Sequence, residues 1–164
     1  MKRSEVDRSK LSPMMLQYME IKDQYIEELV FYRLGDFYEM FFDDALIASK
    51  ELELTLTGRG AGLDERVPMC GVPHNNVKPY IEKLINKGYR VAICEQLEDP
   101  KDTSNRMVKR GIVDVISKGT IADNDLLNSL ESSYIAGINF YKDIINITIL
   151  DISTNYLANL TIEN

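Results

Sequence analysis

The sequence predicts an α/β domain over residues 1–117, followed by strands that begin a second domain. Along the first part, patterns typical of strands alternate with patterns typical of helices, which is the arrangement of α/β proteins. Beyond a polar stretch, three strand-like runs follow one another with only short turns between them. The composition, 45% apolar and 27% charged over 164 residues, is that of an ordinary globular protein, so extensive disorder is excluded.

The first predicted elements are a helix and a strand. Ser12 is a good N-cap residue and Pro13 suits the first helical position, so we expect a helix from there to about Gln24. Residues 29–34 are apolar and aromatic, which favours a buried strand. Gly35 then permits a sharp turn.

A second helix is predicted over residues 36–52. Asp36, with Glu39 three residues later, matches a capping box at a helix start. The apolar stripe of this helix is made of Tyr38, Phe41, Phe42, Ala45, Ser49 and Leu52. Phe37 lies at the margin of the stripe and Glu39 well off it, so we expect both side chains together at an exposed tip.

Alternation, glycine and proline define the remaining elements of the first part. We expect a strand at 54–57, a glycine-rich turn at 58–62, an irregular edge segment at 67–73, a helix at 77–87, and strands at 90–94 and 107–116. Two prolines and a glycine interrupt the segment 67–73, which disfavours a central strand. The glycine-rich turn lacks the Gly-Lys-Ser/Thr ending of a phosphate-binding loop, so a hairpin is the expected structure.

The second part reads as a linker and a β-meander. We expect the linker at 118–132 and the strands at 134–140, 144–151 and 155–162. About 30 residues cannot enclose a core of their own. We therefore expect the chain to be a fragment that stops inside a second domain.

The distribution of charge is more informative than the net charge of -7, which by itself argues against binding DNA. Residues 119–164 carry one lysine and six acidic residues, which leaves residues 1–118 close to neutral. The segment 101–118 contains five basic residues and only two acidic ones. This pattern indicates a module that touches DNA weakly, within a larger protein that supplies the electrostatic attraction.

Several site and targeting classes are disfavoured. Cys70 and Cys94 have neither metal-site spacing nor the density of a secreted disulfide scaffold, and we expect both to be buried thiols. The lone histidine, His74, is expected at the surface or at a cap, so no metal site is predicted. No apolar run approaches the roughly 18 to 20 residues of a membrane span, and no secretory segment is present, which favours a cytoplasmic protein without a membrane partner.

Six separated blocks of the sequence match one family pattern, in order. They are Phe31-Tyr32-Arg33-Leu34-Gly35-Asp36-Phe37-Tyr38-Glu39, Leu54-Thr55-Leu56-Thr57 with Arg59-Gly60, Val67-Pro68-Met69-Cys70-Gly71-Val72-Pro73, Val91-Ala92-Ile93-Cys94-Glu95-Gln96 with Asp99-Pro100, Lys118-Gly119-Thr120, and Leu150-Asp151-Ile152-Ser153-Thr154. In these blocks the sequence resembles the MutS family of DNA mismatch repair proteins. The family usually has Tyr-His after Pro73, so His74 is shifted by one position.

The resemblance implies the domain organisation. Residues 1–117 would form the mismatch-recognition domain, a mixed sheet flanked by helices, and residues 133–164 the truncated start of an RNase H-like connector domain. The clamp, lever and ATPase domains would lie beyond, so we expect no catalytic residue, ATPase activity or cofactor in this fragment. The intact protein is expected to be a dimeric ATPase that uses ATP and Mg²⁺, recruits a downstream MutL-like factor and associates with the nucleoid when on DNA.

The resemblance also implies the site residues. Phe37 would enter the minor groove as a wedge and stack on a mispaired base of double-stranded DNA, while Glu39 would hydrogen-bond that base. Flanking contacts are expected from Leu34, Gly35, Asp36 and Arg59, and further phosphate contacts from Lys109 and Arg110. Without the resemblance, Phe37 would be read as a partly buried aromatic residue and Glu39 as a capping residue.

Two other functions remain open. Asp36, Glu39, Asp43 and Asp44 are four acidic residues within nine positions, which invites a nuclease-like Mg²⁺ cluster. On a helix, however, these residues do not converge without partners from elsewhere. The acidic meander alternatively indicates a protein-interaction module.

Overall fold

The computed structural model describes residues 3–98, 107–118, 134–151 and 156–163. It divides into two compact units, Met1–Ser117 and Lys118–Asn164.

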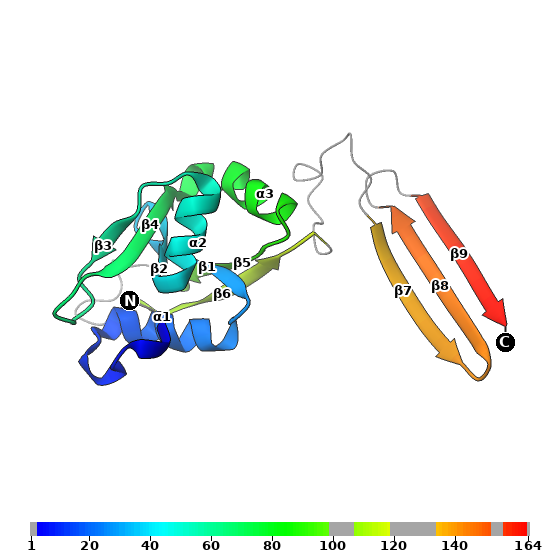
Figure 1. Cartoon of the computed structure of the whole chain (residues 1–164), viewed down its shortest axis with the longest axis horizontal. Coiled ribbons are helices and arrows are strands. Elements are labelled where there is room, and N and C mark those ends of the chain that lie inside the picture. Colours follow the sequence, from blue (N-terminus) through cyan, green and yellow to red (C-terminus); the bar gives the residue numbers. More distant parts are fainter. Residues whose placement is uncertain (1–2, 99–106, 119–133, 152–155, 164) are drawn as a thin grey trace. The chain divides into compact units, whose positions relative to one another are not determined.

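The first unit contains a mixed six-stranded sheet and three α-helices (Figure 1). The elements are α1 (Pro13–Gln24), β1 (Glu28–Leu34), β2 (Phe37–Phe41), α2 (Phe42–Leu52), β3 (Thr57–Arg59), β4 (Val67–Pro73), α3 (Lys78–Asn86), β5 (Arg90–Gln96) and β6 (Arg110–Ile116). The strand order is β3-β4-β2-β1-β5-β6, with β1 and β5 parallel and every other neighbouring pair antiparallel. The predicted α/β class is confirmed.

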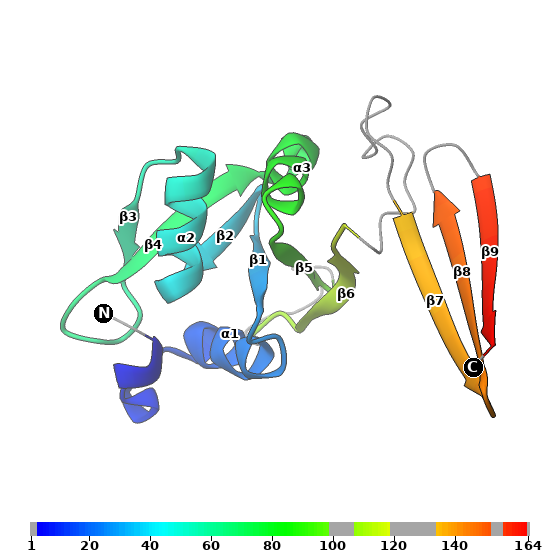
Figure 2. The ribbon, with the colours of Figure 1, turned by 45° about the vertical axis from the view of Figure 1, so that its right-hand side comes forward.

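Helices cover both faces of this sheet, α1 on one side and α2 with α3 on the other (Figure 2). On the α1 side, Tyr18 is fully buried and its ring meets the rings of Tyr32 and Phe41 edge-on, with centroids 5.5 and 5.0 Å away. Such aromatic packing stabilises the contact beyond its buried area. The helix predicted from Ser12 to about Gln24 is confirmed, and the structure adds that it covers one face of the sheet.

The helix predicted over 36–52 is wrong in its first part. Residues 37–41 form β2, which pairs with both β1 and β4, and α2 begins only at Phe42, whose φ is +51°. The segment alternates, with Tyr38 and Met40 facing α2 and α3 and Phe41 facing α1, and pairing on both sides outweighs the capping pattern. Asp36 is therefore a hairpin residue and not an N-cap.

Two further predictions in the first unit need correction. Residues 67–73 form a regular strand, β4, inside the sheet between β3 and β2 and not an irregular edge segment. Its two prolines, Pro68 and Pro73, lie at or next to the strand ends, where a missing N–H disturbs the ladder least. The strand expected at 54–57 lies slightly later, as β3, and takes in Gly58. The helix 77–87 and the strands 90–94 and 107–116 are confirmed with shifted ends.

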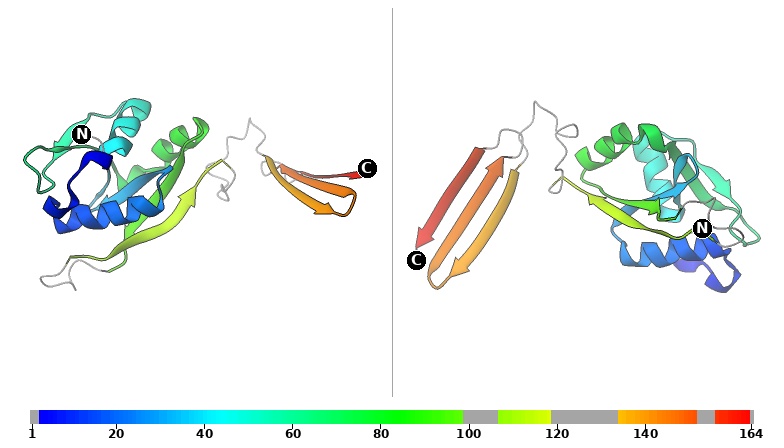
Figure 3. Two further views of the ribbon diagram at one scale, coloured as in Figure 1. Left: turned by 60° about the horizontal axis from the view of Figure 1, so that its bottom comes forward. Right: turned by 180° about the vertical axis from the view of Figure 1, so that it is seen from behind.

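The second unit is an antiparallel meander of β7 (Tyr134–Tyr141), β8 (Ile144–Asp151) and β9 (Tyr156–Glu163), as predicted (Figure 3). Among the residues described in this unit, only Asp151 is buried. The predicted linker lies, from residue 119 on, outside the described residues. None of the described helices is long and apolar enough to cross a membrane.

Candidate nucleic-acid interface

The tip of the β1–β2 hairpin carries the residues predicted to meet DNA. Leu34 and Phe37 form its last pair, and Gly35 and Asp36 make a two-residue loop. Gly35 has a φ of +57°, a conformation that favours glycine at the first position of a hairpin loop. No atom lies within 4 Å of the place where its Cβ would stand, so conformation and not crowding selects the glycine.

Phe37 is exposed because helix α1, which covers this face of the sheet, does not extend as far as Phe37. Side chains two residues apart on a strand share a face, so Phe37, Glu39 and Phe41 all lie on the α1 side. Tyr18 of α1 packs on Phe41, which is 0% exposed, whereas the Phe37 residue is 47% exposed. The hairpin therefore presents a large apolar ring to solvent at the end of a well-packed strand.

Glu39 is half-buried and forms an ion pair with Arg59, which reaches it from β3 across β4. The Arg59 guanidinium carbon also lies 6.0 Å from the centre of the Phe41 ring. Opposite Glu39 stands Gly71, where a Cβ would come within 3.1 Å of the Tyr38 carbonyl oxygen and 3.5 Å of the Glu39 Cγ. The carboxylate is thus held by its partner and by the shape of its surroundings. The expected exposed position is correct for Phe37 only.

Phe37 and Glu39 share the lining of one open cavity of about 290 Å³. Its other lining residues are Thr55, Thr57, Met69, Cys70 and Gly71. The Cys70 thiol is buried and donates to the Ala45 carbonyl oxygen of α2 at 3.5 Å, and burial raises its pKa to about 12, so it is protonated and unreactive. The two predicted reading residues are therefore neighbours in space as well as in sequence.

The hairpin loop is also tied to the end of β4. The backbone N–H of His74 donates to the Asp36 carbonyl oxygen at 2.9 Å, and the His74 Nδ1 lies 3.2 Å from the same oxygen. His74 is partly exposed and is the first residue of a short 3-10 turn whose N-cap is Pro73, so of the two expected positions it holds the one at the surface and not the cap.

The two residues predicted as phosphate contacts differ in their surroundings. Lys109 is exposed. Arg110 is half-buried, its Nε donates to the Arg33 carbonyl oxygen at 2.9 Å, and its guanidinium carbon lies 5.2 Å from the centre of the Tyr32 ring. These contacts make Arg110 a link between β6 and β1, a role that the sequence analysis missed.

The four acidic residues of the nuclease alternative do not come together. Asp43 accepts the Arg3 backbone N–H at 3.1 Å, and Asp44 is buried with the Lys22 Nζ at 2.8 Å. Asp36 is in the hairpin loop and Glu39 is paired with Arg59. Among the described residues, no group of three or more His, Cys, Asp or Glu side chains could hold a metal ion.

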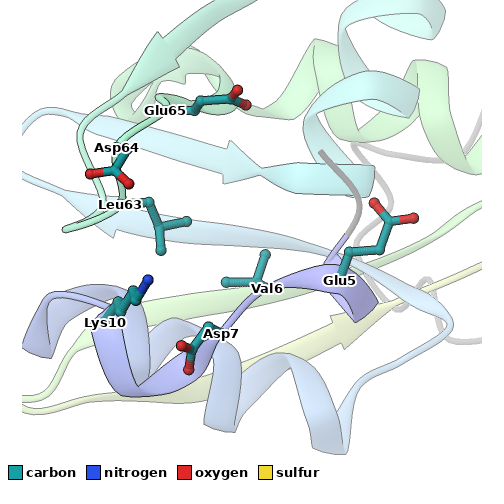
Figure 4. Close-up of a pocket in the computed structure, with 7 residues that line it drawn as sticks. All are labelled: Glu5, Val6, Asp7, Lys10, Leu63, Asp64 and Glu65. Atoms are coloured by element: carbon teal, nitrogen blue, oxygen red, sulfur yellow. The ribbon is translucent and has the colours of Figure 1, made fainter.

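A second cavity, of about 340 Å³, separates the N-terminal segment from the loop between β3 and β4 (Figure 4). Its lining residues are Glu5, Val6, Asp7, Lys10, Leu63, Asp64 and Glu65. The acidic majority makes this cavity unsuitable for a phosphate backbone.

The sequence is similar to proteins of known family. Residues 12–125 match the family model described as MutS domain I. The DNA mismatch repair protein MutS of Clostridium botulinum (strain Eklund 17B / Type B) is 52% identical over 154 residues, which are 94% of this chain and 16% of that protein. The proteins of the same name from Clostridioides difficile (strain 630) and Carboxydothermus hydrogenoformans are 51% and 47% identical, over 92% and 93% of this chain. The chain spans 16% and 18% of the length of those two relatives. This chain belongs to the MutS family, and its matched residues correspond to domain I of that family.

Proposed function

We propose that the first unit recognises mismatched base pairs in double-stranded DNA as part of a DNA mismatch repair protein. The observation that carries the proposal is the exposed ring of Phe37, held at the end of a strand whose other aromatic residues are buried. A half-exposed ring fixed on a rigid element suits insertion between bases, because stacking on a base is independent of its identity.

The signal read by Phe37 is the ease with which DNA deforms. A mispaired step is cheaper to unstack and kink than a correct pair, so the same wedge enters it with less opposition. In this mechanism the ring tests the stability of the duplex and not its sequence. Leu34, Gly35 and Asp36 lie in the same hairpin and would flank the wedge.

Glu39 supplies discrimination in this proposal. A carboxylate near phosphates opposes binding to paired DNA, whereas at a mismatch it accepts a hydrogen bond from an imino N–H that a paired base does not offer. In the free protein, Arg59 forms an ion pair with the Glu39 carboxylate. When DNA is bound, the carboxylate would interact with both Arg59 and the mispaired base. Lys109 and Arg110 would add positive charge near the backbone.

For the whole protein, we propose the organisation that the family resemblance implies. The second unit would begin a connector domain. The full-length protein would be a dimeric ATPase that uses ATP and Mg²⁺, and it would recruit a MutL-like partner. A cytoplasmic location, with nucleoid association on DNA, belongs to the same proposal. Its support is the length of the relatives, of which this chain covers less than a fifth.

The test is DNA binding by the full-length protein that contains this chain. We expect Phe37→Ala to weaken binding to a G·T duplex by about tenfold or more, since base stacking contributes roughly 1 to 3 kcal/mol. Leu46→Ala is the matched control, because it truncates an exposed apolar residue on α2 at the other face of the sheet. Equal effects of the two substitutions would contradict the wedge.

Glu39→Ala tests the second half of the mechanism. We expect it to strengthen binding to a fully paired duplex and to narrow the ratio between mismatched and paired DNA. If both affinities stay unchanged, Glu39 does not discriminate.

A further inference from the structure

Arg33 contacts both sides of the hairpin that carries Phe37. Its Nε donates to the Gly35 carbonyl oxygen at 2.5 Å, and its guanidinium carbon lies 5.6 Å from the centre of the Tyr38 ring. Its Nη1 lies 3.5 Å from the Oε1 of Glu95. Only 17% of the Arg33 side chain is exposed, so these contacts replace most of its contact with water.

Glu95 joins the two hairpin strands to the neighbouring strand β5. Its Oε1 accepts a hydrogen bond from the Tyr38 hydroxyl and also pairs with Arg33. The Glu95 side chain is 29% exposed. Burial, together with the hydrogen bond to Glu95, raises the pKa of Tyr38 to about 12. The phenol therefore remains a hydrogen-bond donor at neutral pH.

These three residues lie on the sheet face opposite to the proposed reading residues. Arg33 and Tyr38 are partners in the strand register, one pair before Leu34 and Phe37. Side chains alternate between faces along a strand, so Phe37 and Glu39 project on the other side. The cluster thus supports the last pairs of the hairpin without occupying the surface offered to DNA.

We propose that Arg33, Tyr38 and Glu95 are positioning residues that hold the hairpin tip and so orient Phe37 before DNA binds. The inference rests on the proposed function, and it adds residues that the DNA never touches. A wedge that is already ordered loses less freedom on binding, and immobilising a loose side chain weakens affinity by about three- to tenfold. Arginine suits this role because its rigid planar group donates to the Gly35 carbonyl oxygen while holding a second nitrogen 3.5 Å from the Glu95 carboxylate, which a lysine cannot do.

The first experiment measures the order of the tip in this chain without DNA. The chain contains no tryptophan, so Phe37→Trp introduces a single fluorescent reporter at the tip. In this background, Arg33→Lys and Glu95→Gln are expected to increase the fast component of the fluorescence anisotropy decay. Arg90→Lys is the matched control, since Arg90 pairs with Glu28 between the same strands, β5 and β1, at the end away from the hairpin, with Nη2 2.7 Å from Oε1.

Thermal unfolding separates positioning from mere stability. A purely structural role would lower the melting temperature for Arg33→Lys and Arg90→Lys alike and leave the indole equally ordered, which would overturn the proposal. If Arg33→Lys does not fold, Tyr38→Phe gives the same test, because it removes only the hydroxyl that donates to Glu95.

The second experiment measures DNA binding by the full-length protein with Phe37 intact. Arg33→Lys is expected to weaken binding to a mismatched duplex by about three- to tenfold and to leave binding to paired DNA unchanged. If Phe37→Ala weakens mismatch binding and Arg33→Lys does not, the positioning role is wrong and the proposed function stands. If Phe37→Ala itself has no effect, the proposed function is wrong, whatever the order of the tip.

Discussion

Arg59 forms an ion pair with Glu39 although a whole strand, β4, lies between the strands that carry them. The two side chains are 34% and 16% exposed, so the pair is shielded without being sealed from water. The contact fixes the Glu39 carboxylate beside the Phe37 ring, on the wall of the same cavity. The arrangement joins two residues, twenty positions apart in sequence, that were predicted separately as contacts to DNA.

A double-mutant cycle should measure the coupling between Glu39 and Arg59 in the free chain. From the free energies of unfolding of Glu39→Ala, Arg59→Ala and the double variant, we expect a coupling of about 0.5 to 1 kcal/mol, because a partly exposed pair is screened by solvent. Urea unfolding in low salt gives these values, and 0.5 M NaCl should reduce the coupling. A coupling of zero at low salt would show that the pair contributes nothing in solution.

Gly71→Ala should displace Glu39 while leaving the rest of the sheet in place. The added Cβ would stand 3.1 Å from the Tyr38 carbonyl oxygen, which must move by a few tenths of an ångström. We expect a loss of about 1 to 2 kcal/mol in the free energy of unfolding and chemical-shift changes centred on Glu39. Gly60→Ala is the control, since nothing lies within 4 Å of its Cβ position. Equal shifts at Glu39 in both variants would contradict this account.

Lys22 and Asp44 form a buried ion pair that should dominate the stability of the first unit. The Asp44 carboxylate also accepts the Val30 backbone N–H at 3.0 Å and the Tyr18 hydroxyl at 3.2 Å, which joins α1, α2 and β1. Lys22→Met leaves this carboxylate buried without its cation, and we expect a loss of about 3 to 5 kcal/mol.

The control for Lys22→Met is Arg8→Met, because Arg8 pairs with Asp23 at the surface, with Nη1 2.5 Å from Oδ2. Its loss should be below about 1 kcal/mol. Urea unfolding measures both variants. Similar losses would mean that Asp44 does not depend on Lys22.

Sequence patterns identified most elements of the first unit because those elements are locally determined. The helix from Pro13 and the helix before Gly88 carry their own start or stop residues and are found within a residue or two of the expected bounds. The helix prediction for residues 36–52 failed in its first part because two sequence signals overlapped there. The capping pattern of Asp36 and Glu39 is local, whereas the strand conformation of 37–41 depends on pairing with β4, about thirty residues later.

The candidate site was predictable only where a motif marks it. Phe37 and Glu39 were singled out from their motif, and the structure places them side by side on one strand face. Nothing in the sequence indicated that Arg59 would pair with Glu39 or that Glu95 would meet Arg33, because long-range side-chain contacts leave no periodicity. The buried state of both cysteines was predicted and is confirmed.

Cys70 and Cys94 provide the last prediction, which concerns pH. Burial raises the pKa of each thiol from 9.0 to about 12 in the folded chain. Below pH 9 the thiols are protonated in both the native and the unfolded chain, and their contribution to stability is complete. Between pH 9 and 12 only the unfolded chain ionises them, which favours unfolding, so this contribution is lost as the pH rises through that range. The loss is at most about 1.4 kcal/mol per pH unit for each thiol.

The comparison of the natural chain with Cys94→Ala isolates this effect from the tyrosines, which both chains share. The difference between their free energies of unfolding in urea should shrink as the pH rises above 9. At pH 8 about one native thiol in 10⁴ is ionised, so labelling by a thiol reagent should proceed through unfolding and accelerate with urea. A difference that stays constant to pH 11, or labelling at pH 8 as fast as in the unfolded chain, would show that the thiols are not protected as this packing requires.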